Sequence, residues 1–152
     1  SINDEMDELP TSVHDEIKTL CAEGDALAER RLYDDAITAY NNAWKLVPAP
    51  QSDWCASTWI LTAIGDACFL GGYFTTGMEA LEYALHCPSG NGNPFIHLRL
   101  GQCAFERGQD AVASDHLARA YMLEGKEIFA LDDSKYFEFV KSKLEPPASG
   151  VW

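Results

Sequence analysis

The residues best suited to chemistry in this sequence are its histidines and cysteines, and neither set has the spacing of a metal or catalytic site. The four histidines are His14, His86, His97 and His116. The five cysteines are Cys21, Cys55, Cys68, Cys87 and Cys103. No histidine pair forms an HExxH motif and no cysteine pair forms CxxC, which argues against a bound metal. Scattered cysteines in odd number favour small packing residues in a reducing compartment over a disulfide framework.

Catalytic signatures are missing as well. The sequence contains no GxSxG motif, no phosphate-binding loop and no dinucleotide fingerprint, and no nucleophile stands beside an evident base. Gly71-Gly72 and Gly90-Asn91-Gly92 are typical of turns. We therefore expect a protein that is not an enzyme and that uses no cofactor. His97 is expected to be a buried, hydrogen-bonded core residue, and His14 a surface residue.

The charge of the chain restricts its partners. It carries 24 acidic and 11 basic residues, for a net charge of −13. Nucleic acids and anionic membranes are therefore improbable partners, because both need clustered lysine and arginine. Such an excess favours a basic protein partner, although ordinary solubility explains it equally well. The acidic N-terminus has no signal-peptide pattern, and the longest apolar window (59–74) is too short to span a bilayer, so we expect a cytoplasmic protein.

One spacing that occurs three times predicts the elements that carry these side chains. A glycine is followed by a small residue, then by a large residue, and then by alanine, at constant intervals. The copies are Gly24–Ala36–Tyr40–Ala43, Gly65–Gly77–Leu81–Ala84 and Gly101–Ala113–Leu117–Ala120. Helices approach closely only where small residues meet, so each copy predicts two antiparallel helices that cross at its glycine. The large residue is expected to fill the space toward the next pair.

The first copy resembles the tetratricopeptide repeat (TPR), a helix–turn–helix unit. Four further residues match that pattern, namely Tyr33, Ile37, Leu46 and Pro48. The second copy departs at Gly77 and has Pro88 one residue early, and the third has Asp110 where the family has an aromatic residue. The resemblance implies an all-α, TPR-like α-solenoid with repeats at about 17–50, 58–91 and 94–127.

Periodicity and turn residues predict seven helices. They are expected near 12–30, 33–47, 53–70, 74–87, 94–107, 110–124 and 133–144, with Asn93-Pro94 as a helix start. The last helix carries an apolar stripe of Tyr136, Phe137, Val140 and Leu144 and is expected to cap the solenoid, with a recognition helix as the alternative. The predicted domain covers 11–145, between an acidic tail at 1–10, expected to be disordered rather than a docking element, and a tail at 146–152.

In TPR proteins the exposed stripe of each repeat's first helix lines the binding surface. Transferred to this sequence, that stripe comprises Lys18, Cys21, Asp25, Glu29, Trp59, Thr62, Asp66, Phe69, Phe95, Arg99, Gln102, Phe105 and Glu106. Aromatic residues dominate binding hot spots and carboxylates select lysine or arginine. The alternative for Phe69 and Phe105 is packing against neighbouring helices or a folded-over tail. TPR receptors of C-terminal carboxylates are excluded, because only Arg99 matches their pattern.

Segments 92–102, 120–129 and 135–139 resemble small bacterial TPR proteins encoded beside polymorphic toxins. This resemblance implies an immunity protein that binds and occludes a cognate, basic toxin domain. Two alternatives stay open. A chaperone of type III secretion translocators would hold an extended, unfolded client, and a general TPR adaptor would bind several partners weakly.

Overall fold

The computed structural model describes residues 9–152, and within that range it contains helices and no strand. The helices are α2 (Thr11–Glu29), α3 (Tyr33–Lys45), α4 (Cys55–Gly71), α5 (Phe74–Leu85), α6 (Pro94–Glu106), α7 (Asp110–Glu124) and α8 (Lys135–Lys143). Two short 3-10 helices, η1 (Gln51–Asp53) and η2 (Lys126–Phe129), lie in the connections. The all-α prediction is confirmed, and the predicted helices agree with the observed ones to within about two residues at either end.

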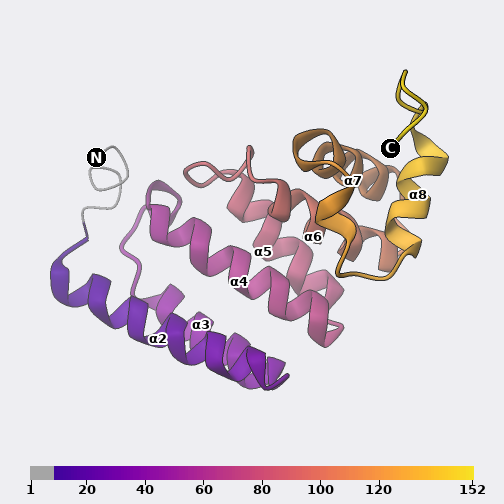
Figure 1. Cartoon of the computed structure of the whole chain (residues 1–152). Coiled ribbons are helices and arrows are strands. Elements are labelled where there is room, and N and C mark those ends of the chain that lie inside the picture. The colour runs from indigo at the N-terminus through magenta and orange to yellow at the C-terminus, as the bar shows by residue number, and fades with distance from the viewer. Residues whose placement is uncertain (1–8) are drawn as a thin grey trace.

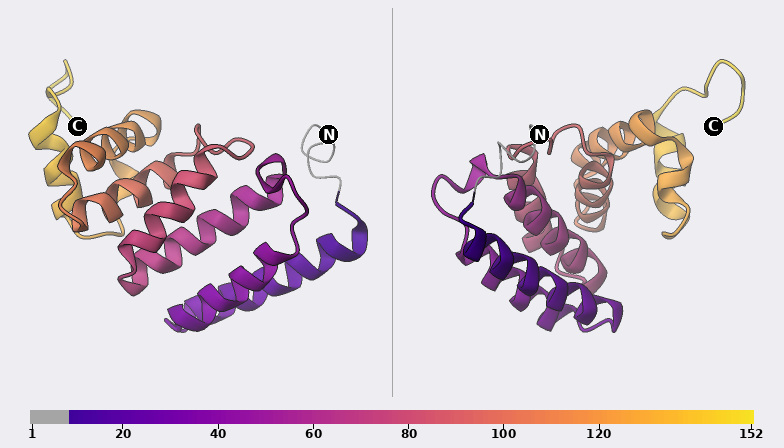
Figure 2. Two further views of the ribbon diagram at one scale, coloured as in Figure 1. Left: turned by 180° about the vertical axis from the view of Figure 1, so that it is seen from behind. Right: turned by 60° about the vertical axis from the view of Figure 1, so that its left-hand side comes forward.

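The helices form three hairpins that stack in chain order. They are α2–α3, α4–α5 and α6–α7, and each helix up to α7 packs against the next along the chain. Figure 1 shows the hairpins following one another from the N-terminal to the C-terminal end of the chain, and Figure 2 shows the same order from two further sides. The first helices of the second and third hairpins, α4 and α6, also contact each other. None of the helices in residues 9–152 is long and apolar enough to cross a membrane.

Each hairpin crosses where the repeated spacing places its glycine. A methyl group at Gly24 would overlap the ring of Tyr40, and the same change at Gly65 or Gly101 would overlap Leu81 or Leu117. The prediction of a close crossing is therefore confirmed. The large residue lies over the glycine of its own hairpin, and its extension toward the next pair stays a prediction. It occupies the volume that the missing side chain leaves.

The first helix of each hairpin ends in a left-handed residue. Gly72 (φ 85°) and Gly108 (φ 73°) take this conformation after α4 and α6, each seven positions beyond its hairpin's glycine. Arg31 takes it at the equivalent position after α2, with φ 61°. Left-handed backbone crowds the Cβ atom of any residue other than glycine, so the first hairpin carries a local strain that the other two avoid.

Both ends of the described chain pack on the helices. Leu9 is buried in the core, so positions 9 and 10 of the predicted acidic tail belong to the folded part, while positions 1–8 lie outside the described residues. At the other end, the ring of Trp152 lies 5.8 Å from that of Tyr121 and 6.3 Å from that of Phe137. The segment predicted as a tail at 146–152 therefore folds back onto α7 and α8.

The apolar stripe predicted for the last helix faces the rest of the molecule. Tyr136 and Val140 of α8 are buried, and Phe137 and Leu144 are half-buried. Their neighbours in a second apolar cluster include Leu117 of α7 and Phe129 of η2. Helix α8 thus covers the apolar surface of the last hairpin, as a terminal helix of a stacked protein must.

Candidate functional site

The predicted binding residues lie on α2, α4 and α6, and we call the surface that they form the α2/α4/α6 face. Its exposed members on α2 are Lys18, Asp25 and Glu29, with Cys21 half-buried beside them. On α4, Trp59 is 54% exposed, whereas Thr62, Asp66 and Phe69 are half-buried. On α6, Arg99 and Gln102 are buried, and Phe95, Phe105 and Glu106 are half-buried. The exposure of the predicted binding side chains therefore declines from the first hairpin to the third.

Arg99 is the centre of a polar network on this face. Its Nε donates a hydrogen bond to Asp66 Oδ1 at 2.8 Å, and its Nη1 donates to Asp132 Oδ2 at 3.0 Å. The same Nη1 also donates to Gln102 Oε1 at 2.8 Å. A buried guanidinium is tolerated only when it is paired and hydrogen-bonded, and two carboxylates together with an amide meet that condition.

Two aromatic rings complete the surroundings of Arg99. Its Cζ lies 4.7 Å from the ring centroid of Phe69 on α4 and 4.9 Å from that of Phe95 on its own helix. Both distances are within the range of cation–π attraction. The carboxylate of Asp132 also accepts a hydrogen bond from Gln102 Nε2 at 2.9 Å, which fixes the loop before α8 against α6.

Helix α8 engages the remaining predicted residues of α6. Its Tyr136 contacts Phe69 and Phe105 edge-on, with ring centroids 5.9 Å and 5.4 Å away. Lys135 pairs with Glu106, Nζ to Oε1, at 2.7 Å. Packing against a folded-over C-terminal element, which the sequence left open for Phe69 and Phe105, is thus what the structure contains. A partner that used these side chains would have to displace α8 or touch only their exposed edges.

The half of the face formed by α2 and α4 is open. Asp25 accepts a hydrogen bond from the hydroxyl of Tyr40 at 2.6 Å, and Thr62 donates within its own helix to the carbonyl of Thr58. Burial, together with the nearby carboxylates of Asp25 and Asp66, raises the pKa of Tyr40 above its ordinary value. Burial and Asp25 also raise the pKa of the Cys21 thiol to about 11. In both cases burial is the larger cause, and the carboxylate of Asp25 adds to it.

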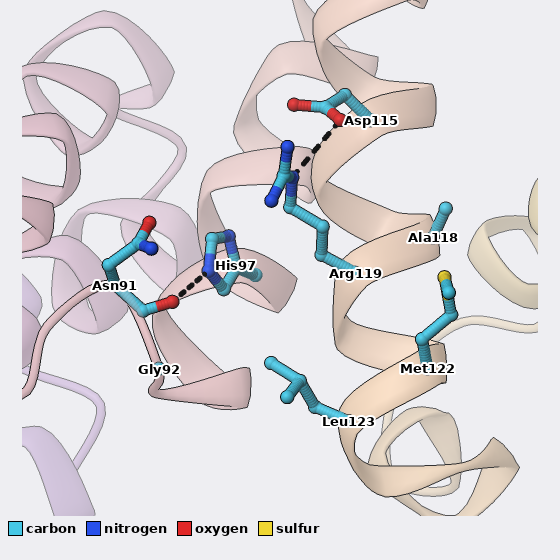
Figure 3. Close-up of a pocket in the computed structure, with 8 residues that line it drawn as sticks. All are labelled: Asn91, Gly92, His97, Asp115, Ala118, Arg119, Met122 and Leu123. Atoms are coloured by element: carbon cyan, nitrogen blue, oxygen red, sulfur yellow. Dashed lines mark hydrogen bonds and ion pairs between the residues drawn. The ribbon is translucent and has the colours of Figure 1, made fainter.

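A second candidate region lies between α6 and α7, and no spacing in the sequence indicated it. Figure 3 shows this pocket, which has a volume of about 600 Å³. Its lining residues are Asn91, Gly92, His97, Asp115, Ala118, Arg119, Met122 and Leu123. Met122 and Leu123 expose apolar side chains at its mouth, and Asp115 and Arg119 pair with each other across one turn of α7. The only buried polar side chain in its lining is His97.

His97 is buried and hydrogen-bonded, which confirms the prediction for this residue. Its Nε2 lies 2.7 Å from the carbonyl oxygen of Asn91, and its Nδ1 lies 2.9 Å from Nδ1 of His116. A carbonyl can only accept, so Nε2 of His97 carries a proton, and neutral His97 then accepts at Nδ1 from His116. Burial and the neighbouring His97 lower the pKa of His116. The pair fastens α6 to α7 and to the loop before α6.

The described residues present little reactive chemistry. No group of three or more histidine, cysteine, aspartate or glutamate residues within 9–152 is arranged to hold a metal ion. Burial raises the pKa of the Cys68 and Cys87 thiols to about 11 and that of Cys103 to about 12, so these three stay protonated near neutral pH. The arrangement is therefore better suited to binding another molecule at its surface. The α2/α4/α6 face has exposed carboxylates and an exposed tryptophan in one half, and its C-terminal half is covered by α8.

In a comparison with known proteins, no family model matches the chain and no curated protein matches it significantly.

Proposed function

We propose that this chain is a TPR-type protein-binding module, and specifically a cytoplasmic immunity protein that binds and occludes a basic toxin domain. The observation that carries the proposal is the open α2–α4 half of the α2/α4/α6 face. There Asp25, Glu29 and Trp59 are exposed in a chain of net charge −13. Exposed carboxylates together with an exposed aromatic residue suit a basic protein surface, in both affinity and rate of association.

The helical hairpins support the TPR part of the proposal. In each of the three, the glycine of the first helix lies beneath the large residue of the second, and a left-handed residue follows seven positions later. A repeated crossing with a repeated turn is what a stack of equivalent units requires. The action proposed for such a stack is binding alone, without catalysis.

The position of α8 favours a folded partner over an extended client. A translocator chaperone needs an open groove in which an unfolded apolar segment can lie. Here Tyr136 covers Phe69 and Phe105, and Asp132 closes over Arg99, so the C-terminal half of that groove is filled by the chain itself. A folded toxin domain can engage the open half without entering the rest.

The test is capture of the tagged protein from its native cells, first at low and then at high salt, with the bound proteins identified by mass. The expected result is one stoichiometric, basic domain that kills cells when expressed alone and is harmless when co-expressed with this chain. Recovery of an unfolded secreted protein, or of several weak partners, would contradict the immunity function.

Variants locate the surface within the same experiment. Charge reversal at Asp25 and Glu29 together is expected to weaken toxin binding by about a hundredfold. Close charge pairs inside an interface contribute more to affinity than charges at its rim do. The matched control is reversal of Glu79 and Glu82, which are exposed on α5. Asp66 is unsuitable for reversal because it holds Arg99. Equal affinity of the two double variants would show that the partner binds elsewhere.

A further inference from the structure

Arg99 shows how the α2/α4/α6 face binds a guanidinium group. The group is paired with a carboxylate of the preceding first helix, Asp66, and it stacks on an aromatic ring one turn earlier on its own helix, Phe95. A planar, weakly hydrated cation suits both contacts at once, whereas an ammonium group makes only the first well. Together with Asp132, Gln102 and Phe69, these two residues form an arginine site that the chain's own side chain occupies.

The repeat register places two parts of this site, a ring and a carboxylate, one hairpin earlier; Asp132, the second carboxylate that binds Arg99, has no counterpart there. Aligning Gly65 with Gly101 sets Trp59 at the position of Phe95 and Ala63 at the position of Arg99. Aligning Gly24 with Gly65 sets Asp25 at the position of Asp66. An aromatic residue and a carboxylate thus recur between α2 and α4, and alanine stands where the guanidinium would originate.

The contacts of these residues leave both available. Trp59 is 54% exposed, so its ring can accept a stacking group. The Tyr40 hydroxyl occupies only Oδ1 of the exposed Asp25, which leaves Oδ2 able to accept. Helices α2 and α4 approach each other less closely than α4 and α6 do.

We propose that the α2–α4 half of the α2/α4/α6 face receives an arginine side chain of the basic protein partner, stacked on Trp59 and paired with Asp25. This proposal rests on the proposed function and names the chemistry of its contact. Ala28 stands where Phe69 stands in the occupied site, so the incoming guanidinium stacks on one ring and is reached directly from solvent. Glu29, one turn beyond Asp25 and exposed, adds attraction for the same cation.

The probes are acetylated tetra-arginine and tetra-lysine peptides, titrated separately into the ¹⁵N-labelled protein and followed by NMR. The arginine peptide is expected to shift the indole N–H of Trp59 and the amide of Asp25, and to bind about fivefold more tightly than the lysine peptide. Equal affinities, or shifts confined to other acidic surfaces such as Asp34 and Asp35, would overturn the proposal.

Three variants test the contacts separately. Asp25→Asn and Trp59→Leu are each expected to weaken arginine-peptide binding by about five- to tenfold, whereas Glu82→Gln, which removes one exposed charge from α5, is expected to change it by less than about twofold. An equal loss of affinity in Asp25→Asn and Glu82→Gln would show that only the net charge of the protein matters, and would overturn the proposal.

Ala63→Arg tests the register from within the chain. An arginine at this position is expected to occupy the site in cis, shift the Trp59 indole N–H without any peptide, and abolish the preference for arginine over lysine. A folded Ala63→Arg protein that keeps that preference would contradict the register argument. A toxin that binds the Trp59→Leu variant as tightly as the parent would rule out this arginine site while leaving the proposed immunity function intact.

Discussion

At the scale of single residues, Arg31 is where the first hairpin differs from the other two. It holds φ at 61° where Gly72 and Gly108 hold similar values without a side chain. Arg31→Gly is expected to raise the free energy of unfolding by about 1 kcal/mol, because it removes the left-handed strain at an exposed position. Urea denaturation measures the change. The control is Arg30→Gly, one residue earlier with φ −85°, which is expected to destabilise the protein or leave it unchanged.

His116 makes the stability of the fold depend on pH. Its pKa is lowered from the ordinary 6.5 by burial and by His97, with Arg119 lowering it and Asp115 opposing. The unfolded chain therefore binds a proton more readily than the folded chain, so stability present above about pH 6.5 is lost as the pH falls below it.

His116→Gln removes this titration while its amide can still donate to Nδ1 of His97. The variant is expected to lose less stability than the parent between about pH 7.5 and about pH 5.5, measured by denaturation at each pH. Contributions from carboxylates are common to both proteins and cancel in the comparison. His86→Gln, at an exposed histidine, is the control and should follow the parent. Parallel curves for all three proteins would contradict the assignment.

At the scale of elements, α8 joins the last two hairpins through a few aromatic contacts. Tyr136 is 4% exposed and touches Phe69 of α4 and Phe105 of α6. Tyr136→Ala is expected to lower the free energy of unfolding by about 3–5 kcal/mol, because it opens a cavity where three elements meet. Leu131→Ser is the control in the adjoining loop, since Leu131 is 99% exposed, and it should change stability by less than about 0.5 kcal/mol. Similar losses of stability in both variants would show that Tyr136 does not anchor α8 to the two hairpins.

The helices could be predicted from sequence because their signals are local. Small residues at fixed intervals gave the hairpins, and Asn93, whose side chain accepts from the amide of Phe95 at 2.9 Å, marked the start of α6. The short helices η1 and η2 carry no period and were not predicted. The pairing of Arg99 with Asp132 was not predictable either, because it joins α6 to an irregular loop beyond α7.

The same distinction applies to the candidate site. The α2/α4/α6 face was predicted as one surface because the resemblance to TPR proteins implies that the first helix of each repeat lines it. Which part of that face remains open depends on where α8 comes to rest. That position is set by tertiary contacts such as Tyr136 on Phe105 and Lys135 on Glu106, which no periodicity records. The role of the open residues in binding stays a prediction.

At the scale of the whole molecule, the two halves of the stack differ in how much of the α2/α4/α6 face is exposed. The C-terminal end is closed by α8, by the Arg99 network and by Trp152 on Tyr121. The α2–α4 half presents exposed carboxylates and Trp59. Under the proposed function, long-range attraction brings a basic partner toward the acidic molecule, and the open half of the face makes the contact.

The closure of the C-terminal half by α8 has a consequence for how this protein can diversify. Residues that hold the fold together, such as Arg99 and Tyr136, are separate from exposed residues such as Lys18, Glu29 and Trp59. Surface substitutions away from packed features cost little stability. Under the proposed function, partner choice can therefore change through α2 and α4 while the C-terminal half keeps the molecule folded. The exposed positions of these two helices are therefore the ones to vary when the scaffold is to be directed to a new partner.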